Sequence, residues 1–160
     1  MVDNFITDIR VTSILTVLLW FKVVITNLGL GGAKAEAGTR APEDFYQKEN
    51  EEASPEAKAA QDRSQRIVNN DLENIPYTMA MAWGSLFCIF LSEASGSGKS
   101  DGLATAHMIC YSIFVAARYG HSISYKFGVA IARSLVYLVG LLCSFAIVII
   151  GAVAAFEITV

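Results

Sequence analysis

Four long apolar runs make up most of the chain, and polar connections separate them. The runs from Asn74 to Ser92 and from Ser134 to Phe156 contain no charged residue. The run from Val11 to Ala33 contains only Lys22, and the run from Gly102 to Tyr125 contains only Arg118. About 20 apolar residues in a helix cross the ~30 Å hydrocarbon core of a bilayer, where a helix satisfies its own backbone hydrogen bonds. The pattern predicts an all-α fold, an integral membrane four-helix bundle with spans at about 10–33, 68–92, 102–125 and 130–156. The alternative is a soluble protein with four buried helices, but such helices are usually shorter.

The charged residues are concentrated between the first two spans. The segment from Lys34 to Arg66 holds 14 of them, although the chain has 160 residues. We therefore predict a polar loop over residues 34–66, in which Pro55 suits the first turn of a helix that continues through Ala60. The net charge of −3 excludes the basic surface of a nucleic-acid-binding protein, and a hydrophobic content of 54% excludes a disordered chain.

The distribution of Lys and Arg predicts the orientation in the membrane. The side of the long loop carries Lys34, Arg40, Lys48, Lys58, Arg63 and, after the third span, Lys126. The opposite side carries only Arg10 and Lys99. Because cytoplasmic loops are enriched in basic residues, we predict that the long loop is cytoplasmic and that both ends of the chain lie on the far side.

Polar side chains recur at helical spacing in three of the four spans, where ionisable residues are costly and suggest a function. Residues three or four positions apart share one face of a helix. Such stripes are formed by Arg63, Arg66, Asn70, Glu73 and Tyr77, by Arg118, His121, Ser122 and Tyr125, and by Arg133, Ser134 and Tyr137. One interpretation is structural: buried ion pairs, such as Arg118 with Glu73, hold the bundle together.

The excess of arginine over acidic residues in these stripes favours an anionic ligand. The planar guanidinium binds a carboxylate through two parallel hydrogen bonds. Glutathione has two carboxylates, one ammonium group and a thiol, which matches several arginines and one glutamate. A phospholipid head group or another organic anion also fits. No metal site is expected, because His107 and the three cysteines lack the spacing of metal ligands.

Three motifs follow one another along the chain. They are Arg66-x-x-x-Asn70-Asp71-Leu72-Glu73-Asn74-Ile75-Pro76, then Arg118-x-x-His121-x-x-x-Tyr125, then Arg133-Ser134-x-x-Tyr137. In order and spacing they resemble the MAPEG family, the membrane-associated proteins of eicosanoid and glutathione metabolism. The string from Asn70 to Ile75 is most similar to the microsomal glutathione transferases and next to microsomal prostaglandin E synthase. Pro42-Glu43-Asp44 is also found in that branch.

The resemblance implies a homotrimer that binds glutathione between neighbouring subunits, near the cytoplasmic face. Position by position, it implies that Arg66, Asn70 and Glu73 hold the glutathione backbone, with Glu73 at the amino group. His121, Tyr125 and Tyr137 would line the same cavity, and Arg133 and Ser134 would act as catalytic residues at the sulfur. Relatives carry an arginine at the end of the first span, and the nearest basic residue here is Lys34.

The function implied by the resemblance is a membrane-bound glutathione transferase. It would use glutathione as co-substrate, without a metal, to attack lipophilic electrophiles that arrive from the bilayer, and it would reduce lipid hydroperoxides as a peroxidase. A glutathione-dependent prostaglandin isomerase and a non-catalytic lipid-binding scaffold of the same fold are the alternatives. In a eukaryotic cell the expected location is the endoplasmic reticulum or the mitochondrial outer membrane.

Overall fold

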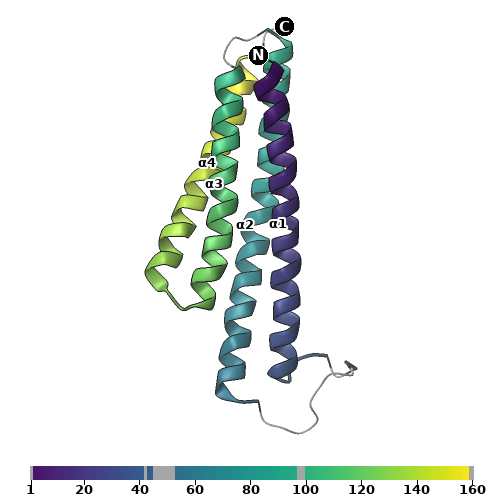
Figure 1. Cartoon of the computed structure of the whole chain (residues 1–160), viewed down its shortest axis with the longest axis vertical. Coiled ribbons are helices and arrows are strands. Elements are labelled where there is room, and N and C mark those ends of the chain that lie inside the picture. The colour runs from purple at the N-terminus through teal and green to yellow at the C-terminus, as the bar shows by residue number, and fades with distance from the viewer. Residues whose placement is uncertain (1, 42, 45–52, 97–99, 159–160) are drawn as a thin grey trace.

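The computed structural model describes residues 2–41, 43–44, 53–96 and 100–158. They form four α-helices that run up and down in chain order (Figure 1). The helices are α1 (Val2–Glu36), α2 (Pro55–Ala94), α3 (Ser100–Lys126) and α4 (Ala130–Phe156). Each contains one of the expected spans. The prediction of an all-α membrane bundle of four helices is therefore confirmed, whereas the homotrimer stays a prediction.

The largest difference from the expected boundaries lies at the start of α2. Residues 55–66, which we expected in the polar loop, form the first three turns of this 40-residue helix. The Ser54 side chain accepts a hydrogen bond from the Ala57 backbone N–H at 3.1 Å, and Pro55 occupies the first turn, where its missing N–H costs nothing. This cap explains why the helix begins at Pro55, as the proline itself suggested.

The helices differ in length, and this difference creates an open end of the bundle. Figure 1 shows that α1 and α2 extend beyond α3 and α4 at the end that carries the long loop, while both termini lie at the opposite end. The short turn between α3 and α4 includes Gly128, whose φ of 71° lies in the left-handed region that glycine adopts without strain. Because α3 and α4 are shorter than α2, the turn between them lies beside the first turns of α2.

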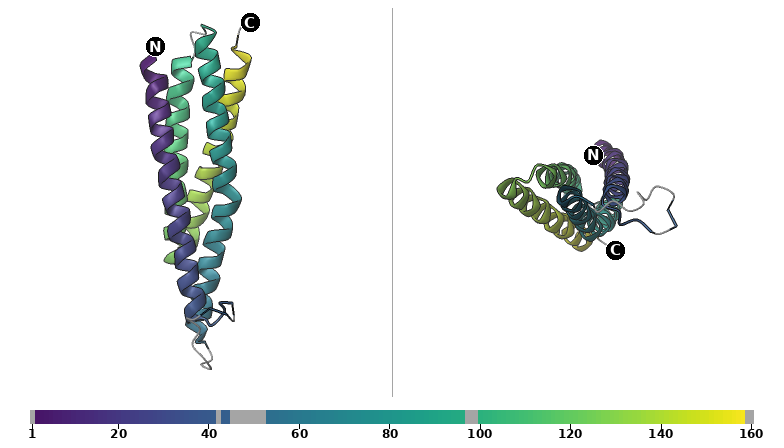
Figure 2. Two further views of the ribbon diagram at one scale, coloured as in Figure 1. Left: turned by 90° about the vertical axis from the view of Figure 1, so that its right-hand side faces the viewer. Right: turned by 90° about the horizontal axis from the view of Figure 1, so that it is seen from below.

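The second and third helices are the central pair of the bundle. Each packs against the other three helices, whereas α1 and α4 share no contact in the described part of the chain. Two further views show α1 and α4 at the outer edges of the bundle (Figure 2). By length and composition α1, α2 and α4 are apolar enough to cross a membrane, and α3 is not among these candidates. Polar residues are acceptable in α3 because its neighbours cover them.

The outward surface of the bundle is apolar, as expected for contact with lipid. Large hydrophobic side chains such as Leu28, Phe87 and Phe145 are more than half exposed. A soluble monomer rarely exposes apolar surface over so many positions. The interior contains Leu19, Ile75, Tyr111, Phe114 and Ile147, all fully buried. The arrangement supports an integral membrane protein.

Small and hydroxyl-bearing residues hold α2 against α4. The Ser85 Oγ donates to the backbone carbonyl of Ile147 at 2.7 Å, and the Thr78 and Ser144 hydroxyls share a hydrogen bond of 2.9 Å. A Cβ atom added at Gly151 would lie only 2.9 Å from the Ser85 Cα. Small residues that let helix backbones approach closely are typical of membrane helix interfaces.

A buried polar cluster ties α1, α2 and α3 together near the end that carries the termini. His107 Nδ1 lies 2.8 Å from Asp8 Oδ1, and its Nε2 lies 3.1 Å from the Ala82 carbonyl oxygen. The Thr12 hydroxyl donates to the same carboxylate at 3.1 Å. His107 is thus a buried residue with bonding partners from two other helices.

Candidate functional site

Three of the predicted site residues meet in one pocket at the open end of the bundle. The pocket has a volume of about 450 Å³ and lies between the first turns of α2 and the turn from α3 to α4. We call this cavity the arginine pocket. It is lined by Ala59, Asp62, Arg63, Arg66, Tyr125, Gly128 and Arg133. Three arginines and one aspartate give this lining a formal charge of +2. The pocket therefore suits an anion of the size of a small organic ligand.

The α3–α4 turn positions the Arg133 side chain. The last turn of α3 carries Tyr125, and the first turn of α4 carries Arg133. The Arg133 guanidinium carbon lies 4.5 Å from the centroid of the Tyr125 ring, which is within the range of a cation–π contact. The ring thus holds this guanidinium at the wall of the pocket, opposite the arginines of α2.

Arg66 is available for a ligand although it has an ionic partner. Its Nη2 lies 3.3 Å from Asp62 Oδ2, four residues earlier in the same helix, and the side chains are 64% and 70% exposed. An exposed ion pair of this kind contributes about 0–1 kcal/mol. A carboxylate that enters the arginine pocket can therefore replace Asp62 as the partner of Arg66 at little cost.

An aromatic cluster lies behind Tyr125 and contains two further predicted residues. The His121 ring centroid is 5.1 Å from that of Tyr125 and 6.0 Å from that of Tyr137. His121 is buried, and its Nδ1 has no hydrogen-bond partner among the described residues. These two residues support the wall of the arginine pocket and do not line it themselves.

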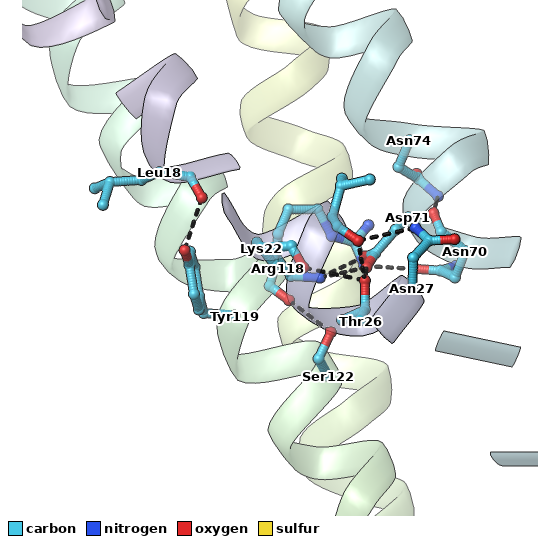
Figure 3. A network of polar contacts seen from close by, with 11 residues as sticks. Leu18, Lys22, Thr26, Asn27, Asn70, Asp71, Asn74, Arg118, Tyr119 and Ser122 are labelled. Carbon is cyan, nitrogen blue, oxygen red and sulfur yellow. Dashed lines mark hydrogen bonds and ion pairs between the residues drawn. The ribbon is translucent and has the colours of Figure 1, made fainter. Parts of the chain in front are cut away.

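A buried layer of charged residues lies deeper in the bundle (Figure 3). Lys22 Nζ lies 2.6 Å from both carboxylate oxygens of Asp71, and the two side chains are 2% and 1% exposed. The Thr26 hydroxyl donates to Asp71 Oδ2 at 3.2 Å. Arg118, which is 1% exposed, donates from Nη2 to Asn70 Oδ1 at 2.6 Å. Two cations and one carboxylate give this layer a formal charge of +1.

The structural interpretation predicted a buried ion pair between Arg118 and Glu73, and this prediction is wrong. Arg118 bonds to Asn70 instead, and the Glu73 side chain is exposed on the surface of α2. The reason is helical geometry: Asp71 points inward toward Lys22, while Glu73, two positions later, points outward. Asn70, expected as a glutathione ligand, accepts a hydrogen bond from the buried Arg118 guanidinium.

The remaining predicted residues lie outside the arginine pocket. The Ser134 hydroxyl donates to the Ala130 carbonyl oxygen at 3.2 Å and is exposed. Lys34 lies in the last turn of α1 and is half-buried. Glu73 has neither a hydrogen bond nor an ion pair with any described residue, so its carboxylate is uncommitted. Pro42, Lys48 and Lys99, used above for the resemblance and the orientation, lie outside the described residues.

The roles of Lys22, Asp71 and Asp8 do not follow from the motifs in the sequence. Lys22 is the only charged residue of the first apolar run, and a lone charge at membrane depth requires a partner. That rule points to an acid on another span, and Asp71 is the acid that the fold supplies. Asp8 precedes the first expected span, and its side chain is fully buried in the bundle.

The family model of the MAPEG proteins matches residues 12–153, which is most of the chain. No curated protein and no solved structure matches the chain. The matched range includes all of α2 and α3, most of α1 and α4, and every predicted site residue. The chain belongs to the MAPEG family, whose members act in eicosanoid and glutathione metabolism.

Proposed function

We propose that this protein is a membrane-bound glutathione transferase that stabilises the glutathione thiolate for attack on lipophilic electrophiles. The arginine pocket carries the proposal, because it brings Arg66, Tyr125 and Arg133 together with Arg63 around one cavity. Glutathione has two carboxylates, and its size fits a cavity of about 450 Å³. Family membership supports the proposal in general terms.

The proposed chemistry begins with the thiol of glutathione. A free thiol has a pKa of about 8.5 and is mostly protonated at neutral pH, although the thiolate is the nucleophile. A guanidinium close to the sulfur favours the thiolate, and each pKa unit of lowering corresponds to about 1.4 kcal/mol. Arg133 is the candidate for this role because the Tyr125 ring holds its guanidinium at the pocket wall. The Ser134 hydroxyl would assist after it releases the Ala130 carbonyl.

The thiolate then forms a bond from sulfur to the electrophilic carbon, and the leaving group departs with its electron pair. With a lipid hydroperoxide, sulfur takes the terminal oxygen and the alcohol leaves. A second glutathione then forms the disulfide and water. The electrophile would enter from the bilayer, which surrounds the apolar outer surface.

A homotrimer is part of the proposal. Four residues of the α2 stripe are exposed in the single chain: Arg63, Arg66, Glu73 and Tyr77. Tyr77 and Glu73 lie beyond Arg66 along α2, toward the interior of the membrane. A polar face at this depth requires cover, and a neighbouring subunit would provide it. The exposed Glu73 carboxylate would then face the amino group of glutathione bound between two subunits.

The scaffold alternative has one observation in its favour. Arg66 and Arg118 both have partners within the subunit, Asp62 and Asn70, as expected of arginines that serve only the fold. The uncommitted positive charge of the arginine pocket argues against it, because Arg63 and Arg133 have no acidic partner among the described residues. Saturable binding of glutathione separates the two functions.

The test is equilibrium dialysis of labelled glutathione against the detergent-solubilised protein, followed by the ultraviolet absorbance of the thiolate. We expect saturable binding with thiolate absorbance at neutral pH, and a loss of affinity in Arg66→Leu. Arg10→Leu is the matched control, because Arg10 is an exposed arginine at the opposite end of the bundle. Absence of saturable binding, or equal losses in the two variants, would overturn the proposal.

A further inference from the structure

The arginine pocket contains one acidic side chain among its cations. Asp62 lines the pocket together with Arg63, Arg66 and Arg133, and none of the three sequence motifs includes it. A carboxylate in a cavity that suits an anion opposes the binding of that anion, because like charges repel each other. Its presence in this lining therefore requires an explanation.

Asp62 lies where it meets every ligand that reaches Arg66. Its Oδ2 atom is 3.3 Å from Arg66 Nη2, one helical turn further along α2. An acid four residues before a base is the favourable order for such a pair on a helix, so the carboxylate stays near the guanidinium. Both side chains are more than half exposed, and dissolved anions therefore have access to them.

The cations of the pocket lie on two walls, and Asp62 belongs to only one of them. Arg63 and Arg66 are on α2, whereas Arg133 is in the first turn of α4, against the Tyr125 ring. A ligand with two separate carboxylates can place one of them at each wall. A compact dianion brings both of its charges to one place.

Repulsion by Asp62 therefore differs between ligands of equal charge. A compact dianion such as sulfate has two negative charges beside the Asp62 carboxylate whenever it binds Arg66. A ligand with separate carboxylates has only one charge there, and salt screens the second charge at the opposite wall. Without Asp62, the three arginines of this open pocket would form a general phosphate site, because the guanidinium suits phosphate as well as carboxylate.

We propose that Asp62 is a specificity-determining residue of the arginine pocket, which favours glutathione over compact oxyanions such as sulfate, phosphate and the phosphates of nucleotides. A charge that opposes the wrong ligand is a common source of specificity. Glutathione tolerates Asp62 because its carboxylates are at opposite ends of the molecule and an ammonium group lies beside one of them. This role rests on the proposed function, since it concerns the same pocket, and it adds which anions that pocket rejects.

The test is competition with labelled glutathione on the detergent-solubilised, full-length protein, with sulfate and glutarate as competitors at constant ionic strength. Both competitors carry two negative charges, but three carbons separate those of glutarate. In Asp62→Asn we expect the inhibition constant of sulfate to fall about fourfold and that of glutarate about twofold, because one exposed charge beside another contributes about a factor of two. Glutathione affinity should change by less than about twofold.

Two further variants are the controls. Asp62→Glu keeps the negative charge one turn from Arg66, so sulfate should compete as weakly as it does with the wild type. Glu56→Gln removes an exposed acid from the first turn of the same helix, and Glu56 does not line the pocket. Both inhibition constants should therefore stay at their wild-type values in Glu56→Gln.

The outcomes separate the role of Asp62 from the proposed function. Intact glutathione binding with an unchanged sulfate constant in Asp62→Asn, or with equal shifts for sulfate and glutarate, would overturn only the role of Asp62. An equal shift in Glu56→Gln would do the same, because the effect would then come from the net charge. If the wild type binds no glutathione, the proposed function is wrong and the role of Asp62 is overturned with it.

Discussion

At the scale of single residues, Glu73 is the one acid of the α2 stripe and the proposed partner of the ammonium group of glutathione. Glu73 is exposed and uncommitted in the subunit. We expect Glu73→Gln to weaken glutathione binding by about 1.5–3 kcal/mol, the usual value of a hydrogen bond to a charged group. Titration calorimetry of the solubilised protein measures this change. Glu56→Gln, an exposed acid in the first turn of α2, should leave the affinity unchanged.

The oligomer mass distinguishes this role of Glu73 from a structural one. Native mass spectrometry of Glu73→Gln should give the same mass as the wild type. If the assembly dissociates while the remaining subunits bind glutathione as before, Glu73 stabilises the subunit interface and its assignment as a ligand is wrong.

The Lys22–Asp71 pair should behave as a unit. Removing one member leaves an uncompensated buried charge, which typically costs about 3–5 kcal/mol, whereas replacing both by apolar residues is often nearly neutral. We therefore expect Lys22→Met to destabilise the bundle strongly and Lys22→Met/Asp71→Leu to recover most of the loss. Unfolding in mixed micelles gives the free energies. The loss of unfolding free energy in the double variant should be much smaller than the sum of the losses in Lys22→Met and Asp71→Leu. A loss equal to that sum would show that the two charges are not coupled.

At the scale of the elements, the packing of α2 against α4 depends on one glycine. A Cβ atom at Gly151 would lie 2.9 Å from the Ser85 Cα and Cβ atoms, so the helices would have to separate. We expect Gly151→Ala to lose about 1–3 kcal/mol, as is usual for overpacking. Gly140→Ala is the matched control on the same helix, since its nearest contact would be an ordinary 3.6 Å from the Ala117 Cβ. Equal melting temperatures of the two variants would contradict this packing.

The elements themselves could be predicted from the apolar runs, because a run of about 20 apolar residues has few alternatives to a membrane helix. Their ends required other information. Pro55 indicated a helix through Ala60, but not that this helix continues without a break into the second span. This continuation brings Arg63 and Arg66 opposite Arg133. Helical spacing predicted that Arg66 and Glu73 share one face of the helix, but not that this face is exposed. It could not predict that Asp71 takes Lys22 as its partner or that Asn70 takes Arg118, because those contacts depend on how the helices pack.

At the scale of the whole molecule, the arginine pocket and the long loop lie at the same end of the bundle. The excess of Lys and Arg at this end predicts that it faces the cytosol, where glutathione would have direct access to the pocket. A protease added to intact microsomes should cut between residues 37 and 54. A tag at either terminus should be protected until detergent is added. Complete protection of the loop would show that the opposite orientation is correct.

The central claim is that the positive charge of Arg133 stabilises the thiolate of bound glutathione. The most direct measurement is the pH–rate profile of conjugation for the wild type, Arg133→Leu and Arg133→Lys. In the leucine variant we expect the apparent pKa of the bound thiol to rise toward the ordinary value of about 8.5. The rate at neutral pH should then fall and recover as the pH is raised, because the thiol ionises without assistance there. Glutathione affinity should fall less than the rate, because Arg66 and Glu73 still hold the ligand.

The lysine variant keeps a positive charge and should lie between the other two, because lysine lacks the planar fork of arginine. If Arg133 merely anchors the start of α4 at the membrane interface, as long basic side chains commonly do, lysine would replace it without effect. Profiles that shift in the order predicted here would support the account. Three superimposable profiles would contradict it and remove Arg133 from the mechanism.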